Sequence, residues 1–263
     1  MTLAARQTPL PGTRPQGSRD ESDAAARVRE MFTRIAPRYD FLNHLLSLSL
    51  DHAWRRRAAK RFRDVLSRPE ARVLDLCCGT GDLAFALNRE RTRLLPGSTT
   101  GLRAPVVGSD FVEPMLTRAR EKAATAHHAA VFAAGDALHL PFADGSFDLA
   151  ATAFGFRNLA NYDDGLREIA RVLKPGGRAG ILEFSEPTGM MAAVFRFYFR
   201  NVLPRVGGAI SGNREAYAYL PSSVAKFPSP SELAARMRAT GFRDIQIASW
   251  NFGSVVLHSA TKE

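Results

Sequence analysis

Apolar residues at helical spacing dominate the first part of the sequence. They predict two helices, one that ends at Pro37 and one from about residue 51 to residue 66, separated by a mixed apolar and polar segment, residues 41–50. The predicted buried face of the first helix consists of Val28, Met31, Phe32 and Ile35. That of the second helix consists of Trp54, Ala58, Phe62 and Leu66.

From residue 72 onward, short apolar runs alternate with helical segments. The runs predicted as strands are 72–76, 105–110, 131–134, 147–153, 178–184, 244–249 and 254–260, and the segments predicted as helices are 82–89, one that ends near residue 124, and 163–173. A last helix starts with a capping box at Ser229 and Glu232 and ends at Gly241. This alternation predicts an α/β fold, with a mostly parallel sheet, helices on both faces and an antiparallel last pair of strands.

The remaining segments define the expected domain organisation. Residues 1–22 contain prolines and glycines without apolar periodicity, and we interpret them as a disordered tail. Residues 23–263 are expected to form a single domain, in which residues 23–68 are an N-terminal helical lid. Residues 187–228 hold many aromatic residues and a Gly207-Gly208 break, and we interpret them as a cap inserted before the last helix.

Composition indicates a globular protein with a basic surface. Of the 263 residues, 45% are apolar and 24% charged, and no run suits a signal peptide or a membrane span, so we expect a cytoplasmic protein. Cys77 and Cys78 are adjacent, which suits neither a disulfide nor a zinc site, and no metal is expected. The net charge of +10 comes mainly from arginines, clustered in residues 55–63 and 196–205. These clusters are either solvated helix faces or a peripheral contact with an anionic membrane.

The most informative motif is residues 73–83, VLDLCCGTGDL, where an apolar strand runs into a turn with Gly79 and Gly81 and then into a helix. Glycines there allow a sharp turn and the close approach of a ligand, with Thr80 between them in contact with it. The helix starts with Asp82, which would repel a pyrophosphate but tolerates a cationic sulfonium. The motif therefore favours S-adenosylmethionine over a nicotinamide dinucleotide as cofactor.

Two further acids follow predicted strands. Asp110 ends the second strand, where a carboxylate can accept hydrogen bonds from ribose hydroxyls, and the alternative is a helix N-cap. The spacing from the glycines exceeds the usual one, in keeping with an insertion around residues 96–101. After the third strand, Asp136 and Ala137 are expected to recognise adenine, unless Asp136 is only a turn residue. The three motifs together resemble the class I S-adenosylmethionine-dependent methyltransferases over residues 72–185, which implies a Rossmann-like, seven-stranded sheet.

Other segments resemble one branch of that class. Residues 39–54, YDFLNHLLSLSLDHAW, are similar to the N-terminal signature of the demethylmenaquinone and 2-polyprenyl-6-methoxy-1,4-benzoquinol C-methyltransferases, with Leu42 in place of the usual Met and Asp51 in place of the usual His. Residues 171–185, RVLKPGGRAGILEFS, resemble the second signature of this family. Residues 154–158, FGFRN, and 212–221, GNREAYAYLP, extend the resemblance to almost all of residues 28–260.

The resemblance implies an enzyme that C-methylates a polyprenylated quinol in menaquinone or ubiquinone biosynthesis. We favour demethylmenaquinol as the acceptor, and the ubiquinone precursor or another small molecule remains open. Residues 41–50 and 195–199 offer apolar surface for the isoprenoid, or pack in the core. A nucleic-acid methyltransferase is disfavoured because residues 153–156, AFGF, lack the proline-containing tetrapeptide of exocyclic-amine methylators. The oligomeric state, including a homo-oligomer, is left open.

The chemistry requires a quinol oxygen that loses its proton, so that the adjacent ring carbon can attack the methyl group. Arg157 and Asn158 follow the fourth strand at the edge where such folds bind ligands, and are the expected catalytic residues. Arg157 would stabilise the phenolate electrostatically, and the alternative is a structural salt bridge. Tyr39 and Asp40 are expected to close over the site from the lid.

Overall fold

The protein is built around one seven-stranded sheet. The structure, a computed structural model, describes residues 12–15, 17–97, 103–126, 129–187, 192–193, 197–198, 201 and 214–263. The strand order is β3-β2-β1-β4-β5-β7-β6. Strand β7 runs antiparallel to both of its neighbours, β5 and β6, and the other neighbouring pairs are parallel. The strands are β1 (Val73–Leu76), β2 (Val106–Asp110), β3 (Ala130–Ala134), β4 (Phe147–Ala153), β5 (Leu173–Phe184), β6 (Phe242–Trp250) and β7 (Val255–Lys262). The predicted fold, with its antiparallel last pair, is confirmed.

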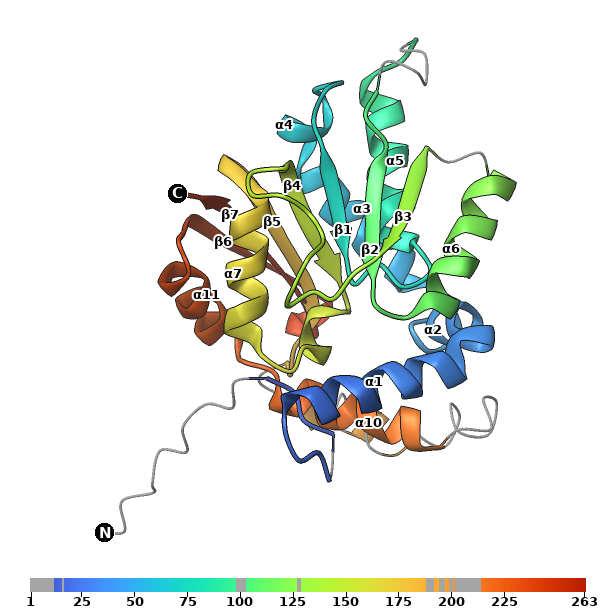
Figure 1. The fold of residues 1–263 in the computed structure, drawn as a ribbon. Helices are drawn as coiled ribbons and strands as arrows, with labels where there is room; N and C mark the ends of the chain where they lie inside the picture. Colours follow the sequence, from blue (N-terminus) through green and yellow to red (C-terminus); the bar gives the residue numbers. More distant parts are fainter. Residues whose placement is uncertain are drawn as a thin grey trace.

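Helices cover both faces of the sheet (Figure 1). The buried side chains of α3 (Leu50–Arg61), α4 (Arg63–Leu66) and α5 (Asp82–Leu94) join those of β1, β2 and β4 in one cluster. Those of α7 (Tyr162–Val172) and α11 (Pro230–Ala239) form the other cluster, with β1, β4 and β5. A further helix, α6 (Glu113–Ala126), packs against β2 and β3. The central strands β1, β2 and β4 are buried along most of their length, as parallel strands between two layers of helices are.

The strand order reverses between β1 and β4, and this position determines where a ligand can bind. Val73 of β1 pairs with Val106 of β2 on one side and with Leu149 of β4 on the other. The chain connections leave β1 and β4 in opposite directions along the sheet, so a crevice opens at the carboxyl ends of these two strands.

Helices α1 (Glu21–Ile35) and α10 (Arg214–Lys226) lie across the carboxyl edge of the sheet, and α2 (Tyr39–Leu46) follows α1 through the short helix η1 (Ala36–Arg38) (Figure 1). Part of the predicted lid, residues 23–68, is placed differently from the prediction. Residues 50–66 belong to the layer on the sheet, because Trp54, Ala58 and Phe62 are buried against strands. The predicted second helix also breaks at Phe62, whose φ of −109° and ψ of 26° separate α3 from α4.

The prediction of a disordered tail through residue 22 is wrong for residues 12–15 and 17–22. Thr13 is buried, its backbone N–H donates to the Leu159 carbonyl at 2.9 Å, and its hydroxyl lies 2.6 Å from that of Tyr162. Asp20 caps α1, which begins at residue 21. Because these hydrogen bonds involve backbone and hydroxyl groups, they need no regularly spaced apolar residues, and apolar periodicity could not have predicted them. Residues 1–11 lie outside the described residues.

Half of the predicted cap, residues 187–228, also falls outside the described residues, and the described half is residues 214–228, which include α10, together with a few positions before them. Strand β5 starts five residues earlier than predicted, at Leu173, because residues 174–177 loop out between two paired segments of the strand. No helix among the described residues is both long and apolar enough to cross a membrane.

Candidate active site

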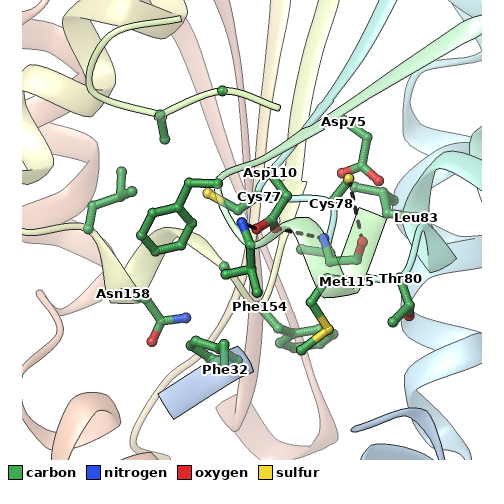
Figure 2. A pocket seen from close by; sticks show the side chains of 18 of the residues that line it. Phe32, Asp75, Cys77, Cys78, Thr80, Leu83, Asp110, Met115, Phe154 and Asn158 are labelled. Atoms are coloured by element: carbon green, nitrogen blue, oxygen red, sulfur yellow. Dashed lines mark hydrogen bonds between the residues drawn. The ribbon is translucent and has the colours of Figure 1, made fainter. Parts of the chain in front are cut away.

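A pocket opens at the carboxyl ends of β1, β2 and β4, where the strand order reverses (Figure 2). Its wall includes the predicted cofactor residues Gly79, Thr80, Asp110, Asp136 and Ala137. Among the residues that the structure describes, the wall contains four acidic side chains and one basic side chain. The acids are Asp75, Asp82, Asp110 and Asp136, and the base is Arg55. Such a pocket favours a ligand with a net positive charge.

The turn after β1 has the backbone conformation that its glycines predict. Gly79 and Gly81 have φ values of +53° and +87°. A Cβ at Gly81 would come within 2.9 Å of the Phe132 ring, so this position needs glycine for space as well as for conformation. Cys77 also has a positive φ, +51°, and Gly155 lies so close that a Cβ there would come within 2.5 Å of the Cys77 Cβ. The backbone at the pocket is thus fixed by tight packing.

Asp110 is buried at the end of β2 and is bound to this turn. Its Oδ2 accepts a hydrogen bond from the Gly79 N–H at 2.8 Å, and its Oδ1 accepts one from the Val112 N–H at 2.9 Å (Figure 2). Burial raises the pKa of Asp110, although these backbone donors oppose the rise. Each carboxylate oxygen has a second lone pair, so the group can still accept hydrogen bonds from a ligand.

Asp75 is a pocket residue that the sequence analysis missed. Its Oδ2 accepts from the Ala84 N–H at 2.8 Å, while its Oδ1 is buried without a partner. Burial raises its pKa well above the ordinary value. An unpaired oxygen in a 1% exposed carboxyl group indicates a place for a donor or a cation. The signal in the sequence was an acid inside an otherwise apolar strand.

Asp136 and Ala137 lie where predicted, on the pocket wall after β3. Asp136 Oδ1 accepts from the Leu138 N–H at 2.9 Å, and its side chain is 44% exposed. Asp136 is therefore a turn residue, one of the two interpretations of its position in the sequence. It also lines the pocket.

Asp40 does not line the pocket, contrary to its predicted catalytic position. Its carboxylate accepts hydrogen bonds from the Thr80 hydroxyl and from Lys122 Nζ, the latter at 3.0 Å. Lys122, on α6, also donates to Asp82 Oδ1 at 2.7 Å and to Thr80 Oγ1 at 3.2 Å. No motif in the sequence analysis pointed to Lys122. The contacts join α2, the glycine turn and α6.

Arg55 occupies a buried position, contrary to the prediction that residues 55–63 form a solvated or membrane-facing cluster. Its side chain is 9% exposed and lines the pocket, with its guanidinium 5.3 Å from the centre of the Phe154 ring. It pairs with Asp51, and its Nη2 lies 3.9 Å from Asp82 Oδ2. Burial opposes its charge, but Asp82 and Asp51 outweigh that effect and raise its pKa. Asp51 also accepts from Ser47 at 2.8 Å and lies 2.9 Å from His44.

Tyr39 and Asn158 both line the pocket, as predicted for residues that contact the acceptor. Asn158 Oδ1 accepts a hydrogen bond from the Tyr219 hydroxyl at 3.1 Å, which directs the amide nitrogen of Asn158 elsewhere. Burial raises the pKa of Tyr39, and the charges of Arg157 and Arg55 oppose the rise in part. Tyr39 is therefore a neutral hydrogen-bond donor at physiological pH.

Arg157 is placed differently from the expectation of a charge facing the acceptor. It is not part of the pocket wall, and its Nη1 lies 3.1 Å from Glu183 Oε2 in a buried ion pair. The same nitrogen donates to the Phe154 carbonyl. The salt-bridge alternative considered for Arg157 is the arrangement that the structure shows.

Comparison with known proteins agrees with this geometry. A profile described as the ubiE/COQ5 methyltransferase family matches residues 20–262. The chain belongs to this family. It is therefore an S-adenosylmethionine-dependent methyltransferase, and the acidic pocket with the unpaired Asp75 oxygen fits a cofactor whose net charge is positive.

Two curated relatives are named demethylmenaquinone methyltransferase. The protein of Deinococcus radiodurans is 51% identical, over 85% of this chain and 88% of its own length, and that of Thermus thermophilus is 49% identical, over 87% and 98%. A relative from Geobacter sulfurreducens, named ubiquinone/menaquinone biosynthesis C-methyltransferase UbiE, is 41% identical over 92% of this chain and 90% of its own length.

Solved structures share the fold. A methyltransferase of Thermotoga maritima, described as a possible histamine N-methyltransferase, has a TM-score of 0.60 at 20% identity, and covers 89% of this chain and 99% of its own. The YcgJ protein of Bacillus subtilis has a TM-score of 0.55 at 18% identity, with coverage of 79% and 98%. These similarities extend to the fold alone.

Proposed function

We propose that the protein transfers the methyl group of S-adenosylmethionine to a ring carbon of demethylmenaquinol and so completes menaquinone. The observation that carries the proposal is the high identity, over most of both chains, to two relatives with this named activity. The pocket supports it, because an aromatic and apolar section of the wall adjoins the acidic one. That section includes Phe32, Phe111, Met115, Phe154 and Leu159.

The acidic section is proposed to hold the cofactor. The turn Gly79–Gly81, with Thr80 in its middle, lies against the methionine part, and Asp110 accepts hydrogen bonds from the ribose hydroxyls. Asp136 and Ala137 contact the adenine. The buried, unpaired Oδ1 of Asp75 is well suited to accept from the cofactor's ammonium group, directly or through a water.

The bound cofactor supplies an electrophilic methyl group on a positively charged sulfur. In the proposed reaction, a quinol hydroxyl releases its proton to water, and the charge of the oxygen delocalises to the adjacent ring carbon. A C–C bond forms as the C–S bond breaks, with the electron pair remaining on sulfur. The ring carbon then loses its hydrogen as a proton, and aromaticity is restored. The protein aligns the groups and excludes water, and positioning can contribute several kcal/mol.

Tyr39 and Asn158 are proposed to hold the quinol oxygen. Tyr39 is a neutral donor, and Asn158, whose carbonyl oxygen is engaged by Tyr219, presents its amide nitrogen as a second donor. Hydrogen bonds that strengthen as the oxygen becomes negative lower the barrier. Arg157 acts indirectly, because its charge favours a negative charge near Tyr39. Asp40 positions the lid over the glycine turn.

A second candidate acceptor is the ubiquinone precursor 2-polyprenyl-6-methoxy-1,4-benzoquinol. The relative from Geobacter sulfurreducens, whose name covers both quinones, favours it. The two acceptors differ in the ring beside the reacting carbon.

Contact with the membrane that contains the quinol is also part of the proposal. The α2–α3 hairpin exposes Phe41, Leu48 and Leu50, which are 59%, 79% and 42% exposed. On α3, Arg56, Arg57 and Lys60 are exposed, and each basic residue near an anionic surface contributes about 1 kcal/mol. Phe41→Ser/Leu48→Ser should reduce sedimentation with vesicles rich in phosphatidylglycerol and leave the melting temperature unchanged. Unchanged sedimentation would exclude this surface.

The activity is tested by incubating the purified protein with S-adenosylmethionine and reduced demethylmenaquinone in detergent, with the benzoquinol precursor and bulk tRNA in parallel. Mass spectrometry should show the naphthoquinol gain one methyl group and the tRNA gain none. Methylation of the benzoquinol alone would select the second candidate, and methylation of tRNA alone would overturn both.

A further inference from the structure

The proposed function gives no role to the positive charge on the described part of the pocket wall. Bound S-adenosylmethionine carries a sulfonium, an ammonium and a carboxylate. Asp75 is the proposed partner of the ammonium group, but the carboxylate also needs a donor or a cation. Arg55 is the only lysine or arginine among the described residues of the wall.

Arg55 lies at the correct end of the pocket for this carboxylate. It is close to Asp82, which begins α5 directly after the glycine turn, and its guanidinium faces the Phe154 ring at the end of β4. The charge of Arg55 also opposes the rise in the pKa of Asp75, the proposed partner of the ammonium group. Arg55 and Asp75 therefore offer a cation and a carboxyl acceptor to the two ionic groups of one amino acid.

Arg55 is held rigidly and retains donor capacity. Its Nη1 donates to Asp51, while Nη2 lies 3.9 Å from Asp82 Oδ2, beyond hydrogen-bond distance. Its neighbours Trp54 and Ala59 on α3 are 6% and 0% exposed. Because α3 is fixed in the core, the guanidinium needs little reorganisation to bind an anion.

We propose that Arg55 binds the α-carboxylate of S-adenosylmethionine, with Asp51 as the residue that orients the guanidinium. The inference rests on the placement of the cofactor in the proposed function. The competing position for the carboxylate is the start of α5, where the Ala84 and Phe85 N–H groups already donate to Asp75 and to the Gly81 carbonyl. The carboxylate of Asp82 lies at that helix start, and like charges disfavour a second anion there.

The test compares two ligands on matched variants by calorimetry. One ligand is S-adenosylmethionine, and the other is decarboxylated S-adenosylmethionine, which lacks only the carboxylate. The wild type should bind the complete cofactor more tightly, by about 10- to 100-fold, the range for a hydrogen bond to a charged group. In Arg55→Met, this preference should largely disappear, because the complete cofactor loses affinity and the decarboxylated one does not.

Three further variants separate binding from folding. Arg55→Met leaves Asp51 buried without its partner, so Arg55→Met/Asp51→Asn is measured as well, and Arg55→Lys should retain part of the preference. Arg56→Met, which changes the exposed neighbour on the same helix, should bind like the wild type. Thermal melts accompany each measurement.

The assignment of Arg55 would be overturned if the wild type bound both ligands with equal affinity, or if Arg55→Met lost affinity for both ligands equally. Methyl transfer by the wild type would continue in either case. Failure of the wild type to bind either ligand would instead contradict the placement of the cofactor and, with it, the proposed function. The two failures are therefore distinct.

Discussion

Arg157 and Glu183 form an ion pair directly behind the pocket wall, with side chains only 7% and 2% exposed. Glu183 Oε1 also accepts from the backbone N–H of Arg157 at 3.1 Å, and Arg157 donates to the Phe154 carbonyl. The pair thus connects β5 to the turn after β4 and fixes the backbone that presents Asn158. The signature FGFRN acquires a structural explanation in this way.

Loss of one partner of this pair should destabilise the protein strongly. Arg157→Ala leaves the Glu183 carboxylate buried and uncompensated, which costs about 3–5 kcal/mol. The double variant Arg157→Met/Glu183→Leu should recover most of that loss, because both charges are removed together. Urea denaturation measures the free energy of unfolding. A stable Arg157→Ala variant with greatly reduced kcat would instead return Arg157 to a direct catalytic role.

Asp110→Ala should weaken the binding of S-adenosylmethionine at least tenfold, or about 1.4 kcal/mol. The variant removes the acceptor of the ribose hydroxyls and the hydrogen bond that holds the Gly79 N–H. Calorimetry gives the affinity, and Asp244→Ala, which changes an acid on the exposed strand β6, is the matched control. Unchanged affinity in a folded Asp110→Ala protein would remove Asp110 from the cofactor site.

Lys122→Met should loosen α2 from the glycine turn. The Lys122 ammonium bridges Asp40 and Asp82, and its loss leaves two carboxylates facing each other near Thr80. Because Lys122 is partly exposed, the effect should be ~1 kcal/mol, roughly fivefold in the opening equilibrium. Amide hydrogen exchange in residues 39–46 should accelerate by that factor, with Lys60→Met as the exposed control. If exchange does not change, these contacts do not hold the lid.

Stability should fall as the pH drops below about 6.5 because of His258. His258 is 2% exposed, its Nε2–H donates to the Pro230 carbonyl at 2.9 Å, and its Nδ1 is buried without a partner. Protonation would put a second N–H where there is no acceptor, and burial lowers the pKa of His258 below its ordinary value of 6.5.

The sign follows from proton uptake. Above the unfolded-state pKa, both states are neutral and His258 has no effect. Between the unfolded-state pKa and the lower folded-state pKa, only the unfolded state takes up the proton, so the free energy of unfolding falls as the pH drops. The total loss is about 1.4 kcal/mol for each pH unit that separates the two pKa values. His258→Gln should flatten this dependence in urea denaturation between pH 8 and pH 5, whereas His52→Gln, at an exposed position, should not. An equal slope in His258→Gln would exclude His258 as the cause.

Elements with strong periodicity or clear boundaries could be predicted from the sequence. Strand β4 has the predicted bounds, and those of β2 and β3 differ from the prediction by one residue, whereas α5 extends to Leu94, beyond its predicted end at residue 89. Burial along most of β2 and β4 accounts for their recognisable strand patterns. Gly79, Asp110 and Asp136 also lie together at the pocket, since their order along the chain determines their position at the sheet edge.

Residues whose placement depends on tertiary contacts were missed or misjudged. Arg55 belongs to an arginine-rich run and looks solvated, but α3 turns this one side chain toward Asp51 and Asp82. Lys122 is an ordinary basic residue of a surface helix until α2 brings Asp40 to it. Arg157 was expected to face the acceptor because its partner Glu183 lies 26 residues away, on β5. No local pattern encodes such pairs.

The most direct test of the proposed function determines which atom of the acceptor receives the methyl group. The purified protein is incubated with demethylmenaquinol and S-adenosylmethionine that carries a 13C-labelled methyl group, and the extracted product is examined by 13C NMR, which separates methyl groups on carbon from those on oxygen. We predict a single labelled signal from a methyl group on the naphthoquinone ring carbon. A labelled methoxy signal, or an acceptor that stays unlabelled while the cofactor binds normally, would contradict C-methylation of this quinol.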